Sequence, residues 1–310
     1  MIEARNLTKR FGKLVALEDM SLDIGPGEVF GFIGPNGAGK STTMKILACL
    51  LKADSGHARI DGHDVRTDGQ VIRRLIGYMP DFLGVYEDLT VDEYLQFFAA
   101  AFQIPRRERQ KVIDGVLELT DLTEKRHSPV DGLSRGMTQR LGVARVLVHD
   151  PKVLLLDEPA SGLDPRARIE MRSLLAELGR MGKSIMVSSH ILTELAELCS
   201  SVGIIEKGRL LFAGTIEEAY QRAKMGDRVR VSLEGGLDAQ HAAALLEGDQ
   251  RVQRVTVSSQ TLVIDLAPQV ASRHFIVERL VAAGAHIGAM RPEEARLEDA
   301  FMRLTKGSVQ

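Results

Sequence analysis

A glycine-rich stretch at residues 34–42 constrains this chain more than any other part of its sequence. In order, it contains Gly34, Pro35, Asn36, Gly37, Ala38, Gly39, Lys40, Ser41 and Thr42. Its glycines, lysine and serine match the phosphate-loop pattern G-x-x-x-x-G-K-[ST]. An apolar run, Val29–Ile33, precedes it as a predicted buried strand, and residues 44–50 follow it as a predicted helix. Strand, glycine loop and helix are the context that this pattern requires, so the stretch predicts a phosphate-binding loop.

Each part of the loop suits an anionic phosphate. Glycine lets backbone N–H groups turn inward around an anion, and the start of the following helix adds partial positive charge. Lys40 is predicted to neutralise the β- and γ-phosphates, and the hydroxyl of Ser41 is predicted to ligate Mg²⁺. Residues 182–184 repeat Gly-Lys-Ser, but Glu177 stands where the first glycine is needed. That second copy is therefore predicted to be a helix end that runs into a strand.

Composition limits the class of protein. The 310 residues are enough for about two domains with a sizeable core. A formal net charge of -2 lacks the basic footprint of a nucleic-acid binder, so no nucleic-acid partner is expected. Cys49 and Cys199 show no metal or redox spacing and suit a reducing cytoplasm. The chain opens without a basic-then-apolar leader and has no apolar run approaching about 18 residues, so a soluble chain is expected.

The remaining pattern is typical of an α/β chain. Residues 2–33 and 54–80 are predicted as β-structure with turns, and the second of these segments ends in a predicted strand at residues 74–79. Residues 82–150 are predicted as a mainly helical insert. Ser134 is predicted to cap one of its helices, which by itself says nothing about function.

Two carboxylates follow a second predicted strand. Val153–Leu156 is a continuous apolar run, as expected of a central parallel strand, and Asp157 and Glu158 come directly after it. Beside a phosphate loop, Asp157 is suited to hold Mg²⁺ through a water, and Glu158 is suited to polarise an attacking water. The alternative is an acidic start to the next helix, but a strand ending in Asp is typical of phosphate-loop enzymes. His190 ends the next predicted strand, at the sheet edge where ligands gather.

These segments together resemble the nucleotide-binding subunit of an ATP-binding cassette (ABC) transporter. The resemblance covers about residues 2–218 and includes each motif of that family in order. It implies that Phe11 stacks on adenine and that residues 34–42 form the Walker-A loop. It also implies that Asp81 takes the Q-loop position and that residues 133–137 are the signature segment. Residues 161–164 would then be the D-loop, and His190 the switch histidine. It implies catalytic roles for Lys40, Glu158 and His190, and metal binding by Ser41, Asp81 and Asp157. The implied nucleotide contacts are Phe11, the nine loop residues named above, Ser134, Arg135, Gly136 and Asp164.

Two places depart from the family pattern. The Q-loop normally carries glutamine, and Asp81 instead adds negative charge beside the triphosphate, which predicts slower hydrolysis or a higher Mg²⁺ requirement. The signature normally reads Leu-Ser-Gly-Gly-Gln, whereas Arg135 and Met137 replace its first glycine and its glutamine. These replacements resemble the ABC-2 export branch. Ser134, Gly136 and the helix N-terminus retain the anion-binding parts of the signature.

The resemblance implies an α/β fold of the phosphate-loop NTPase class, with an ABC-type ATPase domain at residues 1–222. That domain combines a mixed sheet, an antiparallel β subdomain and the helical insert of about residues 82–150. Residues 223–310 are predicted as a small α+β accessory domain, because their order β-α-β-β-α-β resembles a ferredoxin-like module. The boundary is placed around residues 224–227.

By the same resemblance, the chain is expected to bind and hydrolyse ATP with Mg²⁺ and to power a membrane exporter. Two cassettes are expected to form a homodimer on ATP binding, because the signature of each completes the site of the other. The expected partner is a polytopic ABC-2 permease, docked beside residues 82–89, with the chain in the cytoplasm and peripheral at the inner face of the cell membrane. Two alternatives stay open: a soluble ABC ATPase of translation or DNA repair without a permease, and an ATP-dependent binding module that does not hydrolyse.

Overall fold

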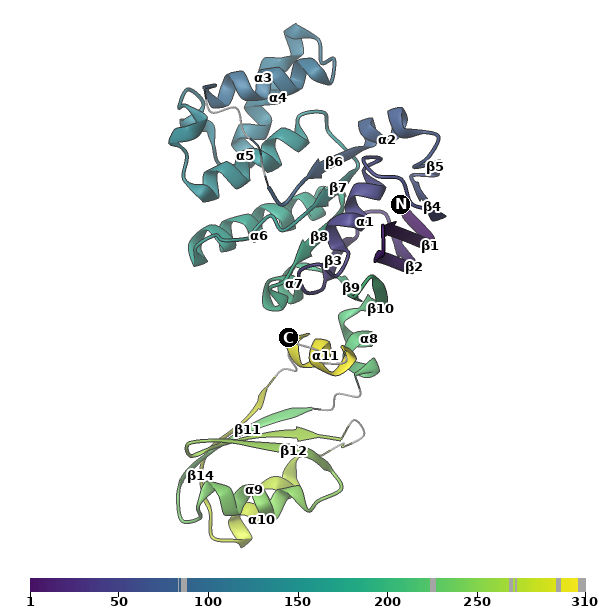
Figure 1. Ribbon diagram of the computed structural model, residues 1–310. Helices are drawn as coiled ribbons and strands as arrows, with labels where there is room; N and C mark the ends of the chain where they lie inside the picture. Colours follow the sequence, from purple (N-terminus) through teal and green to yellow (C-terminus); the bar gives the residue numbers. More distant parts are fainter. Residues whose placement is uncertain are drawn as a thin grey trace. The chain divides into compact units, whose positions relative to one another are not determined.

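The chain folds into two compact units, Met1–Gly214 and Thr215–Gln310. The computed structural model (Figure 1) describes residues 1–305 except for 83, 85–87, 224–226, 268–269, 271 and 294–296. Residues 224–226, on which the predicted domain boundary rested, lie outside the described residues, and a boundary between 222 and 223 stays a prediction. The predicted permease-docking segment, residues 82–89, is also only partly described.

The first unit contains two sheets. The smaller one is antiparallel, with strand order β2-β1-β4-β5, and the larger one is six-stranded, with order β10-β9-β3-β8-β7-β6. The strands of the smaller sheet are β1 (Ile2–Phe11), β2 (Leu14–Ile24), β4 (Ser55–Ile60) and β5 (His63–Asp64). Those of the larger sheet are β3 (Val29–Ile33), β6 (Ile76–Met79), β7 (Val153–Leu156), β8 (Ser184–Ser189), β9 (Ser201–Glu206) and β10 (Arg209–Thr215). Together they are the predicted mixed sheet and antiparallel subdomain.

Helices surround these sheets and also form the predicted insert, in which α3, α4 and α5 lie together (Figure 1). The helices of this unit are α1 (Lys40–Leu47), α2 (Gly69–Leu75), α3 (Val91–Ala101), α4 (Arg106–Leu119), α5 (Arg135–Leu147), α6 (Pro165–Arg180) and α7 (Leu192–Leu198), with short 3₁₀ helices η1 (Thr123–Lys125) and η2 (Val130–Gly132). Every helix in the described part of the chain is too short or too polar to cross a lipid bilayer.

Parallel pairing in the larger sheet decides where the predicted motifs meet. Strand β3 pairs in parallel with β8, with Ile33 opposite Ser189, and β7 pairs in parallel with β8, with Leu156 opposite Val187. All side chains of β3, β7 and β8 are buried, which fixes this register through the core. The residues that follow these three strands therefore emerge at one edge of the sheet.

One prediction in the first unit is wrong. Residues 54–80 were expected to be β-structure with a strand at 74–79, but residues 69–75 form helix α2, and strand β6 starts only at Ile76. A helix of seven residues spans barely two turns, so its apolar positions leave little periodic signal. Ile72 is its only fully buried side chain, and the neighbouring Val71 is exposed. A single buried anchor does not distinguish a helix from a strand.

The second unit contains a four-stranded antiparallel sheet of order β12-β13-β11-β14, and α9 and α10 lie on one face of it (Figure 1). Its elements are α8 (Ile216–Arg222), β11 (Arg228–Gly235), α9 (Ala239–Glu247), β12 (Val252–Ser258), β13 (Thr261–Leu266), α10 (His274–Ala282), β14 (His286–Glu293) and α11 (Leu297–Leu304). The predicted order β-α-β-β-α-β is present, while the likeness to a ferredoxin-like module stays a prediction. Arg228 joins β11 to α11 through a 2.6 Å ion pair with Asp299.

Candidate active site

The loop between β3 and α1 is shaped by two glycines that no other residue can replace. A Cβ on Gly34 would lie 2.4 Å from the backbone oxygen of Ile205, and a Cβ on Gly39 would lie 2.7 Å from that of Ala16. Gly39 also has a φ of 112°, a conformation that L side chains rarely adopt. Its position before α1 leaves the helix without a side-chain cap. The first N–H groups of α1 are therefore available to an anion.

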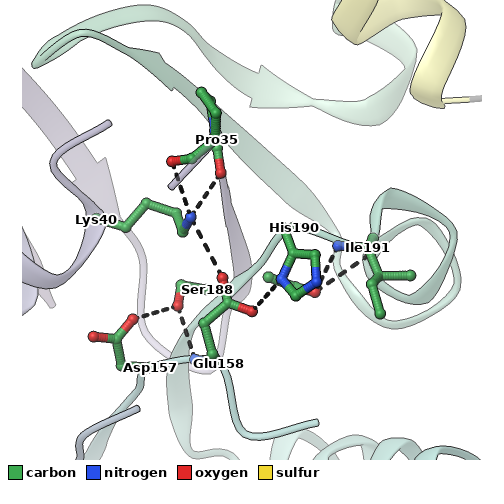
Figure 2. Close-up of polar contacts among 9 residues, drawn as sticks. Pro35, Lys40, Asp157, Glu158, Ser188, His190 and Ile191 are labelled. Atoms are coloured by element: carbon green, nitrogen blue, oxygen red, sulfur yellow. Dashed lines mark hydrogen bonds and ion pairs between the residues drawn. The ribbon is translucent and has the colours of Figure 1, made fainter. Parts of the chain in front are cut away.

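Lys40 is held inside this loop. Its ammonium group donates hydrogen bonds to the carbonyl oxygens of Gly34 at 2.6 Å and Pro35 at 3.4 Å (Figure 2). It also lies 3.4 Å from Oε1 of Glu158. The Lys40 side chain is only 6% exposed, so water screens its charge little and the charge acts strongly on groups in the loop. This position suits a cation that neutralises a bound phosphate.

Asp157 is fully buried directly after β7. Its Oδ1 accepts a 2.6 Å hydrogen bond from the hydroxyl of Ser188 (Figure 2), and its Oδ2 has no hydrogen-bond partner among the described residues. A buried carboxylate oxygen without a partner is costly unless a ligand completes it. Mg²⁺ fits this donor, because it binds proteins through one or two oxygens and keeps its other ligands from water and phosphate.

Glu158 occupies the space between Lys40 and His190. Its Oε2 lies 2.8 Å from Nδ1 of His190, and its backbone N–H donates a 2.9 Å hydrogen bond to Ser188 (Figure 2). Its φ is 52°, in the left-handed region that costs a non-glycine residue free energy. Strain of this kind concentrates at functional sites, where the surrounding contacts hold the residue in place. The carboxylate is thereby fixed beside the loop lysine.

An open pocket of about 530 Å³ lies beside the loop, Lys40, Glu158 and His190, while Asp157 is buried behind it. Its lining includes Phe11, Asp81, Glu158, Ser161, His190, the start of β2 and residues 35–42 of the loop. Phe11 is 49% exposed, and the ammonium of Lys9 lies 5.5 Å from the centroid of its ring. A pocket of this volume, with one exposed aromatic ring and a phosphate loop, suits a nucleotide.

Asp81 and Asp157 act together on Tyr78 of β6. Burial, and then the negative charges of Asp157 and Asp81, raise the pKa of the Tyr78 phenol well above its usual value. The phenol therefore stays protonated, and its buried oxygen has no hydrogen-bond partner among the described residues. The negative charges of Asp81 and Asp157 thus both act at the end of β6 beside the phosphate loop.

Five of the predicted nucleotide contacts do not line this pocket: Gly34 at the start of the loop, and Ser134, Arg135, Gly136 and Asp164. Ser134 caps α5 by accepting a hydrogen bond from the N–H of Met137, as predicted. Asp164 caps α6 by accepting one from the N–H of Ala167. Their assignment to a nucleotide stays a prediction, and it requires that they serve the pocket of a second cassette.

Ser188 is the residue that the sequence analysis missed. The sequence predicts only a strand before His190 at this point, yet the Ser188 hydroxyl bridges Asp157 and the backbone of Glu158. The signal was the parallel pairing of β8 with β7, which places Ser188 one step beyond the Leu156–Val187 pair. Pairing between strands separated by α6 is not visible in a local pattern.

We expect Ser188→Ala to lower ATPase turnover by about tenfold, the order seen when a residue that orients a ligand is removed. The change leaves Oδ1 of Asp157 and the N–H of Glu158 without their shared partner, and it is expected to lower the free energy of unfolding by about 1–3 kcal/mol. Ser184→Ala is the matched control, because Ser184 is buried in the same strand and bonds Gly25 and Gly27 instead. Phosphate release and thermal unfolding separate the two variants, and equal turnover in both would contradict the bridging role.

The glycine loop, the buried lysine, the acidic pair after a parallel strand and the open pocket define a phosphate-loop nucleoside triphosphatase site. Comparison with known proteins narrows this class. The family described as "ABC transporter" matches residues 17–161. The Linearmycin resistance ATP-binding protein LnrL of Bacillus subtilis is 31% identical over 310 residues, covering 98% of both chains. The Nod factor export ATP-binding protein I of Ralstonia nicotianae is 35% identical over 308 residues, covering 98% of this chain and 94% of that protein.

Solved structures agree with these relatives. The ATP-binding subunit of an ABC transporter superimposes with a TM-score of 0.65 at 29% identity, covering 72% of this chain and 92% of that one. A dimeric ATP-binding cassette in a post-hydrolysis state, bound to ADP and Pi, gives a TM-score of 0.63 at 26% identity, covering 70% and 99%. The chain belongs to the ABC transporter family, as an ATP-binding subunit that hydrolyses ATP. The predicted fold and family are confirmed.

Proposed function

We propose that this chain powers an ABC-2 type exporter through ATP-driven dimerisation of two cassettes. The observation that carries the proposal is the placement of the signature segment outside the pocket that holds the loop, Glu158 and His190. A pocket without its signature is completed by a second copy, and the related post-hydrolysis cassette is dimeric. Two relatives that match almost the whole chain are named for Nod factor export and linearmycin resistance, which supports export.

In this proposal, the described side chains divide the work at the phosphates. Ser41 and Asp157 would hold Mg²⁺ beside the bound ATP, and the ion would supply positive charge to the phosphates. Lys40 binds the β- and γ-phosphates from within the loop. Glu158 accepts a proton from the attacking water at a carboxylate oxygen, while His190 holds that carboxylate through the 2.8 Å contact. The exposed face of Phe11 carries the adenine ring.

The signature supplies the opposite wall in the proposed homodimer. The N-terminus of α5, which Ser134 begins, offers backbone N–H groups to the γ-phosphate held by the partner cassette. ATP stabilises the closed pair because it contacts both subunits, and hydrolysis removes that bridge. A polytopic ABC-2 permease at the inner face of the cell membrane then receives the motion.

We expect Asp81→Gln to lower the Mg²⁺ concentration for half-maximal ATPase activity by about threefold, the order of one screened unit charge. Asp81 lines the pocket, and its negative charge repels the triphosphate, which stays anionic with Mg²⁺ bound, so more Mg-ATP is needed to fill the site. The measurement is phosphate release across a Mg²⁺ titration at fixed ATP. Asp131→Asn removes the same charge from an exposed position in η2 and is the control. An unchanged Mg²⁺ profile for Asp81→Gln would rule out this role.

Cell fractionation tests the proposed partner. The exporter subunit is expected to sediment with membranes and to be retained with one polytopic membrane protein after mild detergent extraction. Sedimentation with ribosomes or with nucleic acid would instead support a cassette of translation or DNA repair. A purified chain that binds ATP without releasing phosphate, alone or with that membrane protein, would contradict the hydrolytic role.

A further inference from the structure

Arg135, which replaces the first glycine of the family signature, packs against the D-loop of its own chain. A Cβ built on Gly162 would lie 2.2 Å from both Cζ and Nη2 of Arg135 and 2.4 Å from Nη1. Three atoms at nearly equal distance mean that the guanidinium as a whole fills the space above Gly162. Glycine, which has no Cβ, therefore stands at the position of the D-loop against which the arginine packs.

Gly162 also needs glycine for its backbone, since its φ is 67°. Its neighbour Ser161 lines the nucleotide pocket of the same chain. A second close approach lies beside this one, because a Cβ on Gly136 would be 3.0 Å from Cβ of Ala167 in α6. The signature segment therefore packs tightly against both the D-loop and the start of α6, with little room to slide past either.

We propose that Arg135 is a positioning residue that fixes the D-loop to the signature segment, so that a shift of the signature moves Ser161 in the pocket. The proposal rests on the dimer described above, in which the signature contacts the nucleotide of the partner. A guanidinium suits this role because it is planar, weakly hydrated and able to stack on a flat peptide group. The arginine thereby joins the two nucleotide sites through Gly162.

The test is a double-variant cycle of Arg135→Gly and Gly162→Ala, read as kcat. Each single change is expected to lower kcat by about tenfold, because misplacing a site loop by a fraction of an ångström is costly. The affinity of the loop for a fluorescent ATP analogue without Mg²⁺ is expected to change less than about twofold, which a general loss of structure would not allow. The double variant is expected to be no slower than the slower single variant, because both changes break one contact.

Two controls separate this contact from simpler causes. Gly182→Ala carries the same backbone cost at a φ of 83° with nothing within 4 Å of its Cβ, and it is expected to leave kcat unchanged. Arg135→Lys keeps the charge but not the planar group, and it is expected to restore less than half of the lost kcat. Full restoration by lysine would show that charge toward a phosphate is what matters, and would overturn the proposal.

Multiplied losses in the double variant, or wild-type kcat in Arg135→Gly, would also overturn it. The proposed dimer is tested separately. If the wild-type chain stays monomeric in Mg-ATP by light scattering, the dimer proposal is contradicted. The cycle of kcat values reports the Arg135–Gly162 contact whether or not that dimer forms.

Discussion

Glu158→Gln is expected to convert the chain into an ATP-bound dimer that hydrolyses ATP at least about 100-fold more slowly than the wild type, the order supplied by a general base. The amide keeps the size of the carboxylate but accepts no proton from water. It also removes the negative charge that lies 3.4 Å from the Lys40 ammonium. Binding of the triphosphate should therefore be retained or strengthened while its cleavage stops.

The expected dimer is measured by light scattering in Mg-ATP, with phosphate release measured on the same sample. Glu177→Gln, at a partly exposed carboxylate of α6 paired with Arg180, is the control and should behave like the wild type. A Glu158→Gln chain that stays monomeric in ATP would count against the two-cassette mechanism. A dimer that still turns over ATP at the wild-type rate would remove Glu158 from the proposed base role.

Local patterns were enough to predict much of this site. The phosphate loop is a contiguous run whose glycines meet backbone atoms on two sides, and the strand before Asp157 is fully buried, so each appears directly in the sequence. Ser134 caps its helix as predicted, because its hydroxyl accepts a hydrogen bond from the N–H of Met137 three residues later. These features depend on residues that are close together in the chain, so a local sequence pattern is enough to predict them.

Contacts between distant segments could not be predicted in the same way. Ser188 bridges the acidic pair only because β8 pairs in parallel with β7, and Arg135 reaches Gly162 only because α5 and α6 begin side by side. Helix α2 was missed because it buries one side chain. The assignment of Ser134 to a partner's nucleotide rests on family resemblance, since that nucleotide would lie in the pocket of a second cassette.

Lys40→Ala is expected to abolish ATP turnover and to weaken ATP binding by about 100-fold, because a charge-assisted contact to the phosphates from a nearly buried ammonium is lost. The ammonium already bonds the carbonyls of Gly34 and Pro35, so its position is set before the nucleotide arrives and little ordering cost remains. Its removal also leaves Glu158 without its nearby cation, which adds repulsion between that carboxylate and the phosphates.

Lys45→Ala is the matched control for this change, because Lys45 lies in the same helix with an exposed side chain. Calorimetry with Mg-ATP and phosphate release measure the two variants, and thermal unfolding checks that both are folded. Removing the buried lysine leaves Glu158 and the carbonyls of Gly34 and Pro35 without their shared partner, so the Lys40→Ala chain should be less stable than the wild type but still folded. Near-normal turnover in a folded Lys40→Ala chain would show that the phosphates are bound elsewhere. The proposed roles of Glu158 and His190, which depend on phosphates bound at this loop, would then be contradicted too.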